Sequence, residues 1–235
     1  MPRAIFFDLD DTLLDTSAGV MDSWEIACRE SAPALGVPWD TLRTAILRDM
    51  AEFWRDESAV EHWRTRLVAA REHVIALALA NEGLDVSYAV RMSQTCGLAR
   101  EERLVLFPDS LETLAWLRAT GHRLGLITNG PADMQRAKVD RFKLAPLFDV
   151  VVIEGEFGFG KPSPRVFEHA LNVTGTSPGE AWHVGDNLYA DVGGARNAGL
   201  FAAWIHRGRL ELKDGEPTPD RVFEHLQELR EALSA

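Results

Sequence analysis

The chain contains little that would bind nucleic acid, cross a membrane or form disulfides. Of its 235 residues, 25 are Lys or Arg and 36 are Asp or Glu, a formal net charge of −11, whereas nucleic-acid binding needs a basic surface. The longest apolar stretch, Val74 to Ala80, is too short to span a bilayer. The only two cysteines, Cys28 and Cys96, lie in no C-x-x-C pair, so we expect them to be reduced and packed.

No segment near the start resembles a leader. The first expected strand begins by Ala4, and Asp8 follows before an apolar signal region could be completed. Hydrophobic residues make up 46% and charged residues 26% of the chain, as in ordinary globular proteins. We therefore expect a soluble, cytoplasmic protein, monomeric or homodimeric, with no nucleic-acid or membrane partner.

The residues from about Ser17 to Glu102 carry a helical pattern with few strand signals. Apolar residues recur there at intervals of three and four, which predicts a bundle of roughly four or five helices. Breaks between helices are expected at Ser31-Ala32-Pro33, Gly36-Val37-Pro38, Asn81-Glu82-Gly83 and Gly97.

From Pro108 onward, strands alternate with helices. Helices are expected over about Ser110–Thr120, Ala132–Phe142 and Pro164–Leu171, with another ending at Gly199. Apolar strands are expected over Arg123–Thr128, Val150–Ile153, Ala181–Val184 and Phe201–Ile205. A polar loop over Arg207 to Pro219 precedes a final amphipathic helix through Phe223, Leu226, Leu229 and Leu233.

Near-continuous apolar strands separated by helices predict a parallel sheet that is covered on both faces. The strand from Ala4 to Phe7 belongs to this sheet, so the helical block is an insertion. The fold class is therefore α/β, a three-layer core with a parallel sheet and an inserted helical bundle. We expect the core to span 1–15 and 106–235 and the inserted domain to span 16–105.

Polar clusters follow four of the expected strands. They are Asp8 with Asp10, Thr128-Asn129-Gly130, Lys161-Pro162, and Gly185-Asp186-Asn187 with Asp191. Ligands of open parallel sheets bind outside the carboxyl ends of the strands. All four clusters are therefore expected to meet at one edge.

The carboxylates suit a hard cation and a reaction at phosphorus. Asp8 and Asp186 supply oxygen ligands that suit Mg²⁺, whereas Zn²⁺ would want His or Cys here. Asp8 is ionised at its ordinary pKa and can attack phosphorus to form an aspartyl-phosphate. Asp10 could protonate the leaving oxygen and then deprotonate a water, if nearby carboxylates raise its pKa.

The remaining clusters offer groups that bind phosphate. Thr128 supplies a hydroxyl, and Asn129 and Gly130 supply backbone N–H groups at a strand-to-helix turn. Lys161 adds a positive charge that can neutralise both the nucleophile and the phosphoryl oxygens.

These clusters, in this order, resemble the four motifs of the haloacid dehalogenase superfamily. The resemblance covers about Pro2 to Thr16 and Phe107 to His206, a Rossmann-like core, and the insertion resembles that superfamily's helical cap. The stretches LITNGPADMQRAK (Leu126 to Lys138) and GDNLYADVGGARNAG (Gly185 to Gly199) are most similar to the pyrimidine nucleotidase and N-acylneuraminate-9-phosphatase branch.

The resemblance implies roles for the clustered residues. Asp8 would be the nucleophile and Asp10 the general acid and base. The Mg²⁺ ligands would be Asp8, the backbone carbonyl of Asp10, and Asp186, while Asp191 would support the metal site or Lys161. The implied activity is a Mg²⁺-dependent phosphatase acting on a small phosphorylated metabolite, such as a nucleoside monophosphate or a sugar phosphate.

Other readings stay open. A 2-haloacid dehalogenase would use the same nucleophile without Mg²⁺ and without Asp10 as an acid, so the presence of Asp10 disfavours it. A phosphoglucomutase shares all four motifs. A non-catalytic binding module would have no reason to hold these charged groups together at a cost in stability. The groups are Asp8, Asp10, Lys161 and Asp186.

The insertion is expected to determine substrate choice, because the core motifs address only the phosphoryl group. Its candidates for substrate contact are Trp54, Arg55, Trp63 and Arg64, although a solvated helix face explains the arginines as well. The insertion contains no lysine, which disfavours the phosphonatase branch and its cap lysine. In the core, we expect His183 to be packed in its strand and Glu154 and Glu156 to lie in a solvated loop.

Overall fold

The computed structural model describes residues 1–55, 62–63, 66–208 and 212–234. It divides the chain into two compact units. The first comprises Met1–Asp15 with Val105–Ala235, and the second comprises Thr16–Leu104.

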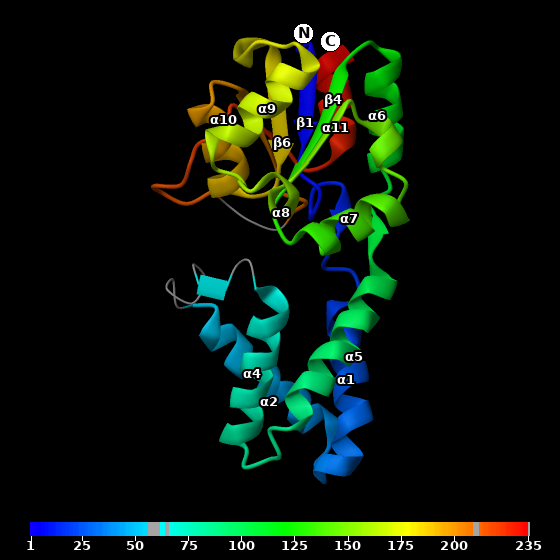
Figure 1. Ribbon diagram of the computed structural model, residues 1–235, viewed down its shortest axis with the longest axis vertical. Helices are drawn as coiled ribbons and strands as arrows, with labels where there is room; N and C mark the ends of the chain where they lie inside the picture. The colour runs from blue at the N-terminus through cyan, green and yellow to red at the C-terminus, as the bar shows by residue number, and fades with distance from the viewer. Residues whose placement is uncertain (56–61, 64–65, 209–211, 235) are drawn as a thin grey trace. The chain divides into compact units, whose positions relative to one another are not determined.

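The first unit is built on a parallel sheet (Figure 1). Its strand order is β5-β4-β1-β6-β7-β8, and every neighbouring pair is parallel. The strands are β1 (Ala4–Phe7), β4 (Arg123–Thr128), β5 (Val150–Ile153), β6 (Ala181–Gly185), β7 (Phe201–Ile205) and β8 (Arg221–Phe223). The α/β fold with a parallel sheet, predicted from the apolar runs, is confirmed.

Helices cover both faces of this sheet because the central strand is apolar on both sides. Ile5 and Phe7 of β1 pack in one hydrophobic cluster with residues of α6 (Ser110–Ala119), α7 (Ala132–Arg141) and α11 (Leu226–Ser234). Ala4 and Phe6 pack in a second cluster with residues of α9 (Pro164–Thr174) and α10 (Gly194–Asn197). All four β1 side chains are fully buried, which is the pattern expected of a parallel strand between two helical layers.

Short elements complete the first unit. The strands β2 (Leu14–Asp15) and β3 (Val105–Leu106) form an antiparallel ribbon. The remaining elements are α8 (Glu154–Phe157), a π-helix (Leu188–Gly193), and 3₁₀ turns over Ala145–Leu147 and Pro178–Glu180. The expected helix that ends near Gly199 is thus divided into a π-helix and α10.

The end of the chain departs from the expected amphipathic helix. Phe223 lies in β8, which pairs in parallel with β7, and α11 begins only at Leu226. The prediction of a helix through Phe223 is therefore wrong. The apolar spacing from Phe223 to Leu226 fits a helix, but Phe223 is buried through the sheet instead.

The second unit is helical. Its described elements are α1 (Val20–Leu35), α2 (Trp39–Phe53), α4 (Leu67–Asn81) and α5 (Tyr88–Arg103). Their shared core includes Trp24, Ile46, Leu79 and Met92.

Two of the expected helix breaks in this unit are wrong. Helix α1 continues through Pro33 and ends at Gly36, which adopts a left-handed φ of 69°. Helix α5 continues through Gly97, where an added Cβ would lie 2.8 Å from the Arg71 guanidinium. Gly97 therefore lies beside the end of the Arg71 side chain and does not end a helix.

Within the described part of the chain, every helix is too short or too polar to serve as a membrane span.

Candidate active site

Asp8 and Asp10 lie in the turn that follows the central strand. The Asp8 N–H donates to the Val184 carbonyl at 2.9 Å, which continues the pairing of β1 with β6. Leu9, between the two aspartates, is fully buried in the core. Asp11 has a φ of 57°, and its N–H closes the turn on the Leu14 carbonyl at 2.7 Å. The chain thus presents both carboxylates at the carboxyl end of β1.

A buried arginine holds this turn from the side. The Arg207 guanidinium donates to the Thr12 carbonyl at 2.7 Å and to both carboxylate oxygens of Asp109 at 2.9 and 3.1 Å. It also lies 3.8 Å from the ring centroid of Phe107. The loop after β7 therefore supports the turn that carries Asp8 and Asp10.

Lys161 joins two of the predicted site residues. Its ammonium donates to Asp8 and lies 2.6 Å from Asp191 Oδ1, while only 2% of its side chain is exposed. Burial alone would lower the pKa of Lys161, but the carboxylates of Asp191 and Asp8 more than offset this and raise the pKa above its ordinary value. Lys161 is therefore a permanent cation at the centre of the site.

Asp191 is held by several donors besides Lys161. His183 Nε2 lies 2.8 Å from Asp191 Oδ1, and the Asn187 N–H donates to Oδ2 at 3.0 Å. Burial alone would raise the pKa of Asp191, yet Lys161 and His183 keep it well below the usual range. Burial lowers the pKa of His183 itself. Because its oxygens already accept these bonds, Asp191 is better suited to orient Lys161 than to bind a cation.

Three carboxylates crowd the same edge of the sheet. One oxygen each from Asp8, Asp186 and Asp191 lie within 4.8 Å of one another. Burial, followed by the charges of Asp8 and Asp191, raises the pKa of Asp186 to about 9. Burial raises the pKa of Asp8 to about 7, against the opposing charge of Lys161. In the absence of a cation, burial and mutual repulsion therefore disfavour the ionised forms of Asp8 and Asp186.

This donor set fits a divalent cation. Three carboxylates face one ammonium, so negative charge is in excess, and a bound cation would relieve the repulsion that raises these pKa values. Asp8 and Asp186 offer oxygen ligands, and the Trp204 indole N–H fixes the Asp186 turn by donating to its carbonyl at 2.7 Å. Hard oxygen donors of this kind suit Mg²⁺-like or Ca²⁺-like cations and not thiophilic metals.

The loop after β4 has partners that sequence reasoning missed. The Asn129 side chain accepts from the Lys161 N–H and donates to the Lys161 carbonyl, both at 2.7 Å. The Gly130 N–H donates to Glu154 Oε2 at 3.0 Å. Asn129 therefore anchors the backbone of Lys161, and in this state Glu154 occupies the N–H expected to bind phosphate.

The expectation of a loop for the two glutamates after β5 is wrong, although Glu156 is exposed to solvent as expected. Glu154 and Glu156 lie in α8 and not in a solvated loop. Glu154 turns back onto Gly130, and Glu156 forms a two-point ion pair with Arg136 at 2.6 and 2.9 Å. Helix α8 has only four residues, which is too short for a periodic pattern of apolar residues to predict it from the sequence.

Helix α7 contributes two residues that sequence reasoning also missed. Lys138 Nζ lies 2.7 and 2.8 Å from the two carboxylate oxygens of Asp10, and Gln135 Nε2 donates to Asp10 Oδ2 at 2.9 Å. Gln135 Nε2 also donates to the Thr128 hydroxyl. The sequence carried a signal for this, namely the three-residue spacing of Gln135 and Lys138. Residues three apart in a helix lie on one face, and here that face is directed toward Thr128.

The structure describes three of the four substrate-contact candidates of the helical unit. Trp54 and Trp63 both pack against Phe53, and Trp63 also stacks on His73, with ring centroids 5.4 Å apart. Arg55 is exposed. Arg64 lies outside the described residues.

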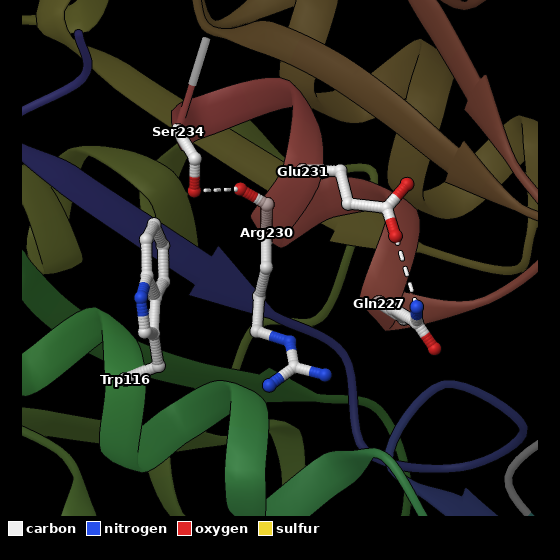
Figure 2. A pocket seen from close by; sticks show the side chains of 5 residues that line it. All are labelled: Trp116, Gln227, Arg230, Glu231 and Ser234. Carbon is white, nitrogen blue, oxygen red and sulfur yellow. Dashed lines mark hydrogen bonds between the residues drawn. The ribbon is translucent and has the colours of Figure 1, made fainter.

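A separate hollow lies between α6 and α11. Figure 2 shows Trp116 of α6 facing side chains of α11, and the lining is completed by Gln227, Arg230, Glu231 and Ser234. The charge of Arg230 is already paired with Glu112 at 2.6 Å. The hollow includes no residue of the four motif clusters, so it is not the candidate active site.

Comparison with known proteins agrees with the motifs. A family model described as haloacid dehalogenase-like hydrolase matches residues 2–199. A phosphoserine phosphatase from Thermus thermophilus is 42% identical over 69% of this chain and 66% of the relative. A glyceraldehyde 3-phosphate phosphatase from Methanothermobacter thermautotrophicus is 32% identical over 99% of this chain and 100% of the relative. N-acylneuraminate-9-phosphatases are also among the matching relatives.

Solved structures show the same fold. The crystal structure of a 2-haloacid dehalogenase from Pseudomonas syringae is 33% identical, covers 100% of this chain and 99% of its own, and has a TM-score of 0.61.

Removing the positive charge of Lys161 should destabilise the protein. Lys161→Met keeps the side chain's volume but leaves Asp8 and Asp191 buried without their partner, so we expect a loss of about 3–5 kcal/mol in the free energy of unfolding. Urea unfolding of both proteins measures this difference in the free energy of unfolding. Lys143→Met removes an exposed lysine and should change the free energy by less than about 0.5 kcal/mol. Equal stabilities of the two variants would contradict the account of Lys161.

The raised pKa values predict how stability varies with pH when divalent cations are absent. Asp8 and Asp186 hold protons in the folded state that the unfolded chain has already released. Their contribution to stability is therefore complete below about pH 4 and is lost as pH rises through 7 and 9. In buffer with EDTA, Asp186→Asn should gain more than about 1 kcal/mol relative to wild type between pH 5 and pH 9. A constant difference across that range would contradict the repulsion.

Proposed function

Because the chain belongs to the haloacid dehalogenase-like hydrolases, we propose that it is a Mg²⁺-dependent phosphomonoester hydrolase. Its substrate is a small phosphorylated metabolite, such as a nucleoside monophosphate or a sugar phosphate. The observation that carries this proposal is the pairing of buried Asp8 with the Lys161 ammonium, with a second carboxylate, Asp10, two residues further along. Relatives named as phosphatases of small phosphomonoesters support it.

The first half of the reaction transfers the phosphoryl group to the protein. A carboxylate oxygen of Asp8 attacks phosphorus, and the bond from phosphorus to the ester oxygen breaks. Asp10 gives its proton to the departing oxygen, which leaves as an alcohol. Lys161 and the Thr128 hydroxyl bind phosphoryl oxygens and stabilise the charge that develops there.

The second half releases inorganic phosphate. A water molecule attacks the phosphorus of the aspartyl-phosphate and gives a proton to the Asp10 carboxylate. The bond from phosphorus to the Asp8 oxygen breaks, which restores the Asp8 carboxylate and the protonated Asp10. No net oxidation or reduction occurs, and one water is consumed for each ester cleaved.

The metal of this proposal is Mg²⁺, held by Asp8, Asp186 and the backbone carbonyl of Asp10. When bound, Mg²⁺ supplies positive charge that neutralises the nucleophile and the phosphoryl oxygens. His183 is the only imidazole that the described residues place against these carboxylates, and its Nε2 is bonded to Asp191. The oxygen donors thus favour Mg²⁺ over Zn²⁺.

The helical unit is proposed to be the cap that selects the leaving group. The aromatic pair Trp54 and Trp63 and the exposed Arg55 are its candidate contacts for a planar or anionic group. The two cysteines, Cys28 and Cys96, are free and buried, which supports a reducing compartment such as the cytoplasm as the place of action.

Dehalogenation at the same nucleophile is the competing chemistry, since a 2-haloacid dehalogenase is among the solved structures of this fold. Displacement of halide needs neither a proton for the leaving group nor a cation. Asp10 and the crowded carboxylates of Asp8 and Asp186 therefore favour phosphate chemistry.

Loss of the nucleophile should abolish turnover without loss of the fold. Asp8→Asn removes the attacking oxygen's charge, and we expect phosphate release to fall by at least about 10³-fold. The midpoint of thermal unfolding, measured in the same buffer, serves as the control for folding. Undiminished phosphatase activity in a folded Asp8→Asn variant would exclude Asp8 as the nucleophile.

Removal of the metal should stop phosphate release reversibly. We expect EDTA to abolish hydrolysis by the wild-type chain and Mg²⁺ to restore it, whereas Asp186→Asn should respond weakly to Mg²⁺ because a ligand is missing. A panel of phosphorylated metabolites, scored by phosphate release, identifies the substrate. Halide release from a 2-haloacid that is insensitive to EDTA, without phosphate release, would favour dehalogenation instead.

A further inference from the structure

Two side chains of α7 form a closed hydrogen-bond network with Asp10 and Thr128. Lys138 Nζ contacts Asp10 Oδ1 at 2.7 Å, Asp10 Oδ2 at 2.8 Å and Gln135 Oε1 at 2.8 Å. Gln135 Nε2 contacts Asp10 Oδ2 at 2.9 Å and the Thr128 hydroxyl. Helix α7 begins four residues after Thr128, so one helix face reaches both the proton-transfer residue and the phosphate-binding loop.

The donors and acceptors of this network admit only one arrangement. The Lys138 ammonium can donate three hydrogen bonds but cannot accept one. The Gln135 atom that faces Lys138 must therefore be the amide oxygen. The Gln135 amide nitrogen then faces Asp10 and Thr128 and donates one hydrogen bond to each. All three Lys138 hydrogens are used as well. The network is complete and specifies how each member is oriented.

This arrangement also orients the Thr128 hydroxyl. Because that oxygen accepts a hydrogen from Gln135, its own hydrogen must point elsewhere and is free to donate to a phosphoryl oxygen. Thr128 and Gln135 are 1% and 2% exposed, so water does not compete for these positions. Gln135 therefore sets the direction in which Thr128 donates.

We propose that Gln135 and Lys138 are positioning residues for the phosphatase reaction. In this state the network holds Asp10 as a carboxylate, because both of its oxygens accept hydrogens. Lys138 keeps that carboxyl group in place when it takes up the proton that it passes to the leaving group, and Gln135 directs the Thr128 hydroxyl toward the phosphoryl group. The inference rests on the proposed function and deepens it by adding α7 to the residues that determine the rate. Small errors in the position of a proton-transfer group lower rates steeply.

A purely structural role predicts something different. The Lys138 side chain is 17% exposed and that of Asp10 is 31% exposed, so this partly buried pair contributes to stability. A loss that acted only through folding would reduce turnover of every substrate alike. The positioning role predicts instead an effect on kinetics that depends on the leaving group.

The test compares kcat/KM for two substrates in Lys138→Met. An alkyl phosphate, such as glycerol phosphate, releases an alkoxide that needs a proton, whereas 4-nitrophenyl phosphate releases a stable phenolate that does not. We expect the alkyl value to fall by about 10–100-fold and the nitrophenyl value by less than about threefold. Lys143→Met, the matched loss of an exposed lysine, should change neither, and Lys138→Arg should recover part of the alkyl activity.

A double-mutant cycle links the effect to Asp10. In an Asp10→Asn background, Lys138→Met should cause no further loss, because the group that it positions is already absent. Gln135→Leu should instead raise KM for both substrates and weaken inhibition by inorganic phosphate, since Thr128 loses its direction.

Other outcomes would overturn the inference. Equal losses on both substrates in Lys138→Met would mean that Lys138 acts on the phosphoryl group or on folding. Additive losses in the Asp10→Asn background, or no loss at all, would separate Lys138 from Asp10. If the wild-type chain releases phosphate from no member of the metabolite panel in Mg²⁺, the proposed function itself fails; the positioning role fails alone if the chain is a phosphatase but Lys138→Met loses nothing on an alkyl ester.

Discussion

The Lys161 ammonium, buried among carboxylates, is the interaction on which the site depends. Without it, the charges of Asp8 and Asp191 would be held in a desolvated place at a large cost in stability. Its own position is fixed from two sides, because Asn129 binds its backbone and Asp191 its side chain. Asp191 is in turn held by His183 and by the turn after β6. These residues come from four strands of one sheet: Asp8 follows β1, Asn129 follows β4 and Lys161 follows β5, while His183 and Asp191 lie in and after β6.

The parallel sheet makes this convergence possible. Strands β1, β4 and β6 are neighbours, and their carboxyl ends deliver Asp8, Thr128 and Asp186 to one edge. Helices cover the apolar strands on both faces, so a polar side chain within the sheet would be buried at a cost in free energy. Polar groups therefore gather where the strands end. Negative charge is in excess there, because three carboxylates face one ammonium, and this excess suits a divalent cation.

Much of the fold could be predicted from the sequence, because its signals are local. The runs at Ala4, Arg123, Val150, Ala181 and Phe201 are short, apolar and bounded by turns, and each is a strand. The resemblance to the haloacid dehalogenase superfamily, carried by four spaced motifs, is confirmed by the family match. Chain order and the rule for parallel strand ends were enough to expect Asp8, Lys161 and Asp186 on one edge.

The rest depends on packing that no local pattern encodes. Gln135 and Lys138 reach Asp10 only because α7 lies against the turn after β1, some 125 residues away in the chain. Asn129 binds Lys161 because the segment after β5 folds into α8, a helix too short to leave a periodic signal. The position of Phe223 fits the apolar spacing of a helix and of a strand. It lies in a strand because β8 pairs with β7.

The proposed reaction requires Asp8 to become phosphorylated during turnover. A rapid acid quench of the Mg²⁺-loaded protein with an excess of a phosphomonoester that it hydrolyses, followed by borohydride reduction and peptide mass spectrometry, measures this. Reduction converts an aspartyl-phosphate into homoserine, so we expect homoserine at position 8 and at no other aspartate. Hydrolysis that proceeds with position 8 unmodified, or with the modification at Asp10 or Asp186, would contradict it.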